Sequence, residues 1–245
     1  MTAAAATATG PVPAQSASRD QQSLGMRRWG CILGMLLAPW GFVAANLCYA
    51  LAISDGGSDN TGADALLLFG DHPLLVRVGL TAGMVGCILL IPAVSGLFRL
   101  APGSRAVLIG GSLMTAGYVC YFGVLHADFR TLAMAEHGGD PALFASVIDA
   151  GQADPTAAWV FLLFVLGNLV GTTIVGVGLL SSRRVPRLAA IGLLCWPPLH
   201  VIGLIFFGNE IPQVLGAVLQ ALGFAGCALT LAHRTASERL ASAGR

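Results

Sequence analysis

Residues 74–98 read LLVRVGLTAGMVGCILLIPAVSGLF, and Arg77 is the single charged residue in this stretch. A helix crosses the hydrocarbon core of a bilayer with about 20 consecutive apolar residues. A helix also satisfies its own backbone hydrogen bonds, which lipid cannot do. The stretch therefore predicts a transmembrane helix.

Five further stretches have the same character, and short polar or Gly/Pro-containing connections separate them. The chain is 56% hydrophobic and only 10% charged, whereas soluble domains carry about 25% charged residues. We therefore expect an all-α, polytopic transmembrane helix bundle. Its six predicted spans are residues 29–52, 74–98, 106–125, 157–180, 188–207 and 211–232.

The arginines predict an orientation. With a cytoplasmic N-terminus, eleven of the thirteen basic residues, all arginines, lie on the cytoplasmic side, and ten of the twelve acidic residues lie outside. Cytoplasmic loops of membrane proteins carry an excess of basic residues. We therefore expect both termini in the cytoplasm and a multi-pass protein of the plasma membrane. The absence of lysine and the abundance of alanine and glycine suggest a GC-rich bacterial genome.

Two tails flank the predicted transmembrane domain, residues 27–234. Residues 1–26 are rich in Ala, Thr, Ser, Gln and Pro without apolar periodicity, which predicts a disordered cytoplasmic tail. Residues 235–245 form a second cytoplasmic tail. A signal peptide cleaved near residues 50–52 is an alternative, but the apolar run before that point exceeds the usual core of about 7–15 residues.

Short apolar patches and small residues complete the predicted layout. Residues 65–69 and 142–148 interrupt the two longer outer loops and suit short helices at the membrane interface. Gly167 and Gly171 lie four positions apart in the fourth span, a spacing that lets two helices approach closely. Such stripes pack a bundle and leave homodimerisation open.

Residues 195–200 read CWPPLH in the middle of the fifth span. Pro197 and Pro198 have no N–H, so the carbonyls of Leu193 and Leu194 lose their helical donors. We expect the span to bend at this point. The freed carbonyls then need a donor from a neighbouring helix or a water molecule.

Polar side chains at similar depth predict a pocket near mid-membrane that opens outward. Polar groups within lipid usually face the bundle interior and pair there. One interpretation is a permanent kink with a neutral, hydrogen-bonded histidine at position 200. The other is the binding or proton-handling site of a transporter or sensor, since histidine titrates near neutral pH and broken helices mark such sites. The candidate ligand-binding residues are His200, Asn168, Gln220, Asn46, Tyr118, Tyr121 and Arg77.

Arg77 allows three interpretations of its own. It lies one turn into the second span from the outer side, so its side chain can reach the interface. It can instead pair with Asp71 or another outer acidic residue, or bind an anionic group of a substrate.

A metal site on the outer face is the alternative for His72, His126 and His137. Imidazole is a common metal ligand, but no HxxH or HExxH spacing occurs and the residues belong to separate loops. The chain also lacks P-loop, nucleophile-elbow and dinucleotide-binding motifs. We therefore predict no catalytic residues, no cofactor and no metal.

The layout resembles small, uncharacterised six-span bacterial integral membrane protein families. In these families an Arg- and Pro-rich inner loop, such as residues 183–187 here, leads into a span that begins Leu-Ala-Ala-Ile-Gly. The resemblance covers the general layout and implies membrane location without a specific activity.

These observations predict a non-enzymatic binding, transport or accessory protein with a mid-membrane polar pocket. The alternative is an intramembrane or outer-face metal-dependent enzyme. The expected partner is the lipid bilayer, and a membrane protein partner or a homodimer stays open. A net charge of +1 without a basic patch does not favour nucleic-acid binding.

Overall fold

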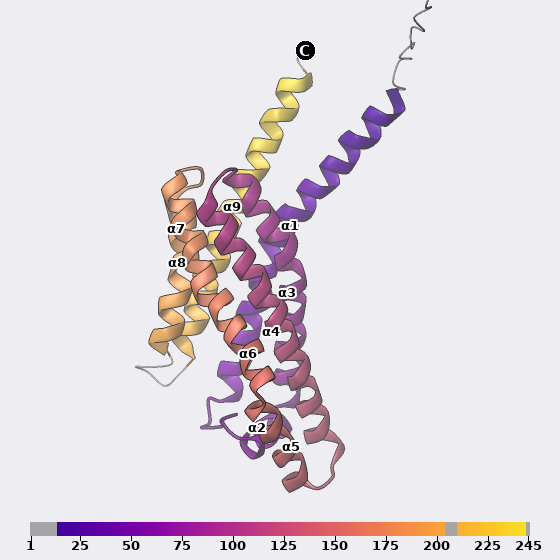
Figure 1. Cartoon of the computed structure of the whole chain (residues 1–245), viewed down its shortest axis with the longest axis vertical. Helices are drawn as coiled ribbons and strands as arrows, with labels where there is room; N and C mark the ends of the chain where they lie inside the picture. Colours follow the sequence, from indigo (N-terminus) through magenta and orange to yellow (C-terminus); the bar gives the residue numbers. More distant parts are fainter. Residues whose placement is uncertain (1–13, 204–209, 244–245) are drawn as a thin grey trace, which may run out of the picture.

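The structure is a computed structural model that describes residues 14–203 and 210–243 (Figure 1). Regular structure in these residues is helical throughout, as the sequence predicts. The elements are α1 (Ala14–Ala52), α2 (Gly62–Asp71), α3 (Pro73–Leu100), α4 (Arg105–His137), α5 (Pro141–Ala153), α6 (Pro155–Val165), the π-helix η1 (Leu166–Gly171), α7 (Thr172–Ser182), α8 (Arg187–Ile202) and α9 (Ile211–Ala243).

Five helical stretches in the described residues are long and apolar enough to cross a membrane. They correspond to five of the six predicted spans and indicate a membrane-embedded, multi-pass protein. The remaining predicted span, residues 188–207, begins with α8, which is apolar but shorter. Its last four residues lie outside the described part of the chain. The five long stretches are Gly25–Ala52, Pro73–Leu100, Arg105–His137, Pro155–Ser182 and Ile211–Ser237.

The helix α8 runs antiparallel beside α9. Added side-chain carbons at Gly216, Gly223 and Gly226 of α9 would meet, in turn, atoms of Trp196, Leu193 and Ala189 of α8. As the residue number increases along α9, the number of the residue that it faces on α8 decreases. The chain therefore returns through α8 from the end of the bundle where α7 stops to the end where α9 begins (Figure 1).

Charged residues separate between the two ends of the bundle. We call one the arginine end, defined by Arg99, Arg105, Arg183, Arg184 and Arg187 at the termini of α3, α4, α7 and α8. At the opposite, acidic end lie α2 and α5, in the lower part of Figure 1. We define the acidic end by Asp59, Asp71, Asp128, Glu136, Asp149 and Glu210.

Arg234 of α9 connects the loops at the arginine end. Its guanidinium donates to the carbonyl of Leu100 at 3.0 Å and to that of Arg184 at 2.6 Å. Arg184 in turn donates to the carbonyl of Pro102 at 3.3 Å. Carbonyls in the last turn of a helix lack intrahelical donors, so Arg234 satisfies the C-terminus of α3 and holds two loops against α9.

Asp-Pro pairs start both helices between α4 and η1. Asp140 accepts from the backbone N–H groups of Ala142 and Leu143 at 3.0 and 3.3 Å, and Asp154 accepts from Thr156 at 2.7 Å. An aspartate cap followed by proline is a favourable helix start. The hydrogen bond from Thr156 lowers the pKa of the Asp154 carboxyl, because it stabilises the charged form.

The helices α2 and α5 contain the two apolar loop patches that the sequence marks as short helices. They pack together at the acidic end, where the N–H of Gly62 donates to Asp149 at 2.6 Å. Their backbones approach so closely that a Cβ at Gly62 would meet the carbonyl oxygen of Ala145. The helices α2 and α5 therefore form one helical layer over this end.

The helix α1 begins at Ala14, within the segment that the sequence assigns to the N-terminal tail. Residues 14–26 are helical in the structure, while residues 1–13 lie outside the described part of the chain. Residues 14–24 contain no glycine or proline and include several good helix formers. Extending a helix that already exists avoids the cost of nucleation, so the transmembrane helix continues into this segment. The second expected tail, from residue 235, also continues α9 as far as Ala243.

Two glycine pairs bring α4 against the π-helix η1. A Cβ at Gly167 would lie 2.5 Å from the Cα of Gly117, and a Cβ at Gly171 would lie 3.0 Å from the carbonyl oxygen of Gly110. Backbone atoms cannot move aside as a flexible side chain can. The small residues that the sequence marks in the fourth span therefore set the distance between α4 and η1.

Replacing Gly117 with alanine should lower the free energy of unfolding by about 1–3 kcal/mol, because the new methyl group meets backbone atoms of η1. Gly123→Ala is the matched control on the same helix, where an added Cβ meets nothing within 4 Å. Thermal unfolding in lipid nanodiscs compares the two variants. Equal midpoints would contradict the close contact between α4 and η1.

Candidate functional site

A cavity of about 350 Å³ lies in the half of the bundle toward the acidic end. Residues of α1, α2, α3, α4, α6, η1, α8 and the first turn of α9 line it, together with Asp59 and Glu210 from the connections. Volumes of this size are typical of pockets for small molecules, which span about 300–1,000 Å³. We call it the central cavity.

Asn168 connects three elements at the inner end of the central cavity. Its carbonyl oxygen accepts from the hydroxyl of Tyr118 on α4 and from the indole N–H of Trp196 on α8, both at 2.8 Å. The side chain is only 3% exposed, and buried amides need such partners. The amide oxygen of Asn168 thus accepts from two neighbouring helices at once.

The π-helix places Asn168 where it can make these contacts. It occupies Leu166–Gly171 in the middle of the fourth predicted span, between α6 and α7. A π turn inserts an extra residue into a helix and is frequent at functional sites. The glycine contact with α4 brings this turn close enough for the Asn168 amide to reach Tyr118. Apolar composition alone does not distinguish such a turn from an ordinary helix.

His200 lies one turn after Trp196 on α8, and their ring centroids are 4.9 Å apart. Its side chain lines the central cavity and contacts Gln213 of α9. The buried Nδ1 atom of His200 has no hydrogen-bond partner. The helix α8 continues through both prolines as far as Ile202, so His200 is presented from a regular turn.

Gln220 is a second buried polar group with unused hydrogen-bonding capacity. It is 2% exposed and lies beside Tyr118, and its Nε2 atom has no partner. An unpaired buried polar group costs about 1–3 kcal/mol. Native structures usually explain such groups by a water molecule, an ion or a ligand.

Aromatic rings form one wall of the central cavity. The ring of Phe42 lies 4.5 Å from that of Tyr118, and Tyr121 stacks on Phe164 at 4.3 Å with an interplanar angle of 10°. The rings of Tyr118 and Tyr121 are 6.2 Å apart and meet edge to face. These separations favour aromatic pairs, so the wall is held in a defined shape from α1, α4 and α6.

Carboxylates line the outer end of the central cavity. Asp59, Asp128 and Glu210 belong to the lining, and the hydroxyl of Tyr49 donates to Asp59 at 2.8 Å. Burial raises the pKa of Glu210 to about 6, and the negative charge of Asp59 adds to the shift. This end of the cavity is therefore acidic and partly desolvated.

The structure brings most of the candidate ligand-binding residues together. Asn46, Tyr118, Tyr121, Asn168 and His200 all line the central cavity. Gln220 stands outside the lining, next to Tyr118. Arg77 does not line the cavity.

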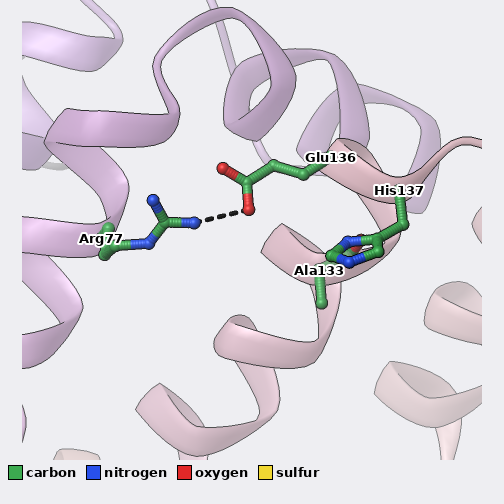
Figure 2. Close-up of polar contacts among 4 residues, drawn as sticks. All are labelled: Arg77, Ala133, Glu136 and His137. Atoms are coloured by element: carbon green, nitrogen blue, oxygen red, sulfur yellow. Dashed lines mark hydrogen bonds and ion pairs between the residues drawn. The ribbon is translucent and has the colours of Figure 1, made fainter.

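Arg77 pairs with Glu136 of α4, with 2.5 Å between the guanidinium nitrogen and the carboxylate oxygen (Figure 2). About half of the Arg77 side chain is exposed. Of the three interpretations of Arg77, the structure therefore favours pairing with an acidic residue near the outer loops. The partner is Glu136, not Asp71.

The three histidines of the metal alternative do not form one site. His72 lies 3.5 Å from Asp55, and the ring of His137 contacts the carbonyl of Ala133 on its own helix (Figure 2). Within residues 14–203 and 210–243, no three His, Cys, Asp or Glu side chains gather so that they could hold a metal ion. His72 and His137 therefore contact different residues, Asp55 and Ala133.

Sequence reasoning misses several residues of the site. Trp196 stands inside the segment singled out for its prolines, and its indole N–H makes one of the two contacts to Asn168. Asp59 and Asp128 belong to outer segments that resemble solvated loops. In the fold, Asp59 accepts from the hydroxyl of Tyr49, and both acids line the cavity. The sequence places them on the side toward which the predicted pocket opens, and this is the signal that it offers.

Comparison with protein-family models, with curated proteins and with solved structures finds no match for this chain.

Replacing Asn168 with leucine should lower the free energy of unfolding by about 2–4 kcal/mol, because the hydroxyl of Tyr118 and the indole of Trp196 then lose their acceptor. Asn46→Leu is the control, since the Asn46 amide donates to the Phe42 carbonyl within its own helix. The Asn46→Leu substitution should lower the free energy of unfolding by less than about 1 kcal/mol. Chemical unfolding in detergent measures both, and equal losses would refute the central role of Asn168.

Proposed function

We propose that this protein is a six-span protein of the plasma membrane, with its arginine end in the cytoplasm, that binds a small molecule in the central cavity. Binding serves as the recognition step of a transporter or sensor. The observation that carries the proposal is the cavity itself, which is lined by aromatic rings, by Asn168 and His200, and by carboxylates.

The number of passes follows from the course of α8. Its 16 residues correspond to about 24 Å at 1.5 Å per residue. It packs antiparallel to α9, whose long apolar stretch has membrane length. A helix beside a transmembrane helix over such a distance lies within the same layer of lipid. We therefore count α8 as the beginning of the remaining span.

The orientation follows from the separation of charge. The loops at the arginine end contain Arg99, Arg105, Arg183, Arg184 and Arg187, whereas the cavity mouth and the layer of α2 and α5 are acidic. Basic residues near the ends of transmembrane helices are retained on the cytoplasmic side. The central cavity then faces the exterior.

The binding role follows from the composition of the cavity. Its lining is mainly apolar and aromatic, with a few convergent polar groups such as Asn168, His200 and Gln213. This combination is typical of small-molecule sites, where apolar contact supplies affinity and polar groups fix orientation. The imidazole of His200 lines the cavity and provides one such group for a ligand.

Single cysteines at positions 140 and 184, in a variant without native cysteines, test the orientation. A membrane-impermeant maleimide added to intact cells should label position 140 and leave position 184 unlabelled until the membrane is permeabilised. Both positions are on exposed segments of the chain, so access to the thiol depends on the side of the membrane. The reverse pattern would refute the proposed orientation.

Native Cys48 tests whether the cavity admits molecules from water. Cys48 lines the cavity, whereas Cys87 is 5% exposed and lies outside its lining. Methyl methanethiosulfonate, a small uncharged thiol reagent, should modify Cys48 in the protein in nanodiscs at least about tenfold faster than Cys87, since reaction requires access to the thiol. Peptide mass spectrometry measures both rates. If Cys48 reacts no faster than Cys87, the cavity is closed and the binding proposal fails.

A further inference from the structure

The geometry points to a ligand class. We propose that the central cavity binds a small organic cation, with its positive group among Asp59, Asp128 and Glu210 and its apolar body against the aromatic wall. This inference rests on the proposed binding function, and it specifies the charge and shape of the ligand that the cavity accepts.

Among the residues described, the cavity has three acidic lining residues, and its basic lining residue is His200. Its lining includes three carboxylates and no arginine, and the whole chain has no lysine. Arg77, an arginine of α3 near this end, is paired with Glu136 outside the lining. A cleft lined by carboxylates in low-dielectric surroundings concentrates cations and repels anions.

The carboxylates also lack a basic partner among the described residues, and the hydroxyl of Tyr49 is a neutral donor to Asp59. Within the described part of the chain, no ion pair joins Asp59, Asp128 or Glu210 to a basic side chain. The pKa of Glu210 is raised instead, by burial first and by the charge of Asp59 second. A bound cation would remove this repulsion, whereas a bound anion would increase it.

The aromatic wall suits the rest of such a ligand. Tyr49, Tyr121 and Phe164 line the cavity together with Phe42 and Trp196. Aromatic faces attract cations, most strongly where water is excluded, and quaternary ammonium groups are recognised in this way. The same faces bury the hydrocarbon part of an amphipathic ligand.

An organic cation fits these residues better than a metal ion. Within the residues that the structure describes, the three carboxylates do not lie close enough together to hold a metal ion. A metal ion needs several oxygen ligands at about 2.0–2.6 Å. An ammonium group carried on a larger body satisfies separated carboxylates through longer contacts, and a volume of about 350 Å³ accommodates it.

Three probes of similar shape separate charge from size. Benzyltrimethylammonium is a cation, neopentylbenzene is its uncharged isostere, and benzylsulfonate carries a negative charge. Each is tested for its ability to protect Cys48 from methyl methanethiosulfonate in the full chain in nanodiscs. We expect protection by the cation at concentrations at least about tenfold below those of the other two, since removing one favourable charge contact costs about this factor or more.

Variants then test the carboxylates. Asp128→Asn and Glu210→Gln should each raise the half-protecting concentration of benzyltrimethylammonium about tenfold. Each value is compared with the labelling rate of the same variant without probe. Asp71→Asn is the matched control, because Asp71 is an exposed carboxylate at the same end that does not line the cavity. Two variants on different elements keep the test valid if one fails to fold.

The outcomes separate this inference from the proposed function. The cation site would be overturned if the cation and its uncharged isostere protect Cys48 equally, or if the sulfonate protects it better. It would also be overturned if the half-protecting concentration of benzyltrimethylammonium is unchanged in both folded variants. Rapid labelling of Cys48 in those same experiments would leave the binding cavity intact. Failure of Cys48 to react with the uncharged reagent would overturn the cavity and, with it, both proposals.

Discussion

The carbonyl oxygen of Asn168 is the contact on which the arrangement of the bundle around the cavity depends. It accepts from Tyr118 and Trp196, both at 2.8 Å. It therefore joins α4, η1 and α8 at a buried point where the protein itself supplies the hydrogen-bond partners. Within lipid there is no hydrophobic drive to bring helices together. A polar contact shared by three elements, beside a glycine contact that excludes any side chain, therefore sets their spacing.

The cavity is a consequence of that spacing. The π turn displaces the fourth membrane-length stretch at Asn168, and aromatic rings of α1, α4 and α6 fill only part of the space toward the acidic end. Polar atoms of His200 and Gln220 are left without partners. The arginine end is closed differently, because Arg234 connects the carbonyls of two loops there. The bundle is thus tightly connected at one end and hollow toward the other.

Much of the candidate site could be predicted from the residues alone. Polar side chains are so costly within an apolar span that Asn168, His200, Tyr118 and Tyr121 could be expected to share one interior. Asp59 cannot be predicted in this way, since it resembles any solvated loop residue. Arg77 is a candidate ligand-binding residue from its depth in the span, whereas its guanidinium pairs with Glu136 outside the lining of the cavity. In each case local sequence does not specify the direction in which the side chain points.

The helices and the separation of charge can be derived from the residues alone. Apolar stretches of membrane length favour a helix, which satisfies its own backbone hydrogen bonds, and arginine and carboxylate alternate between successive connections. The packing of the helices establishes which polar groups meet, that the fourth stretch contains a π turn, and that three carboxylates from distant segments line one cavity. These features depend on contacts between residues far apart in the chain, such as Gly117 with Gly167. The physical reason is that a helix fixes the face of each residue but leaves its partner to the packing of neighbouring helices.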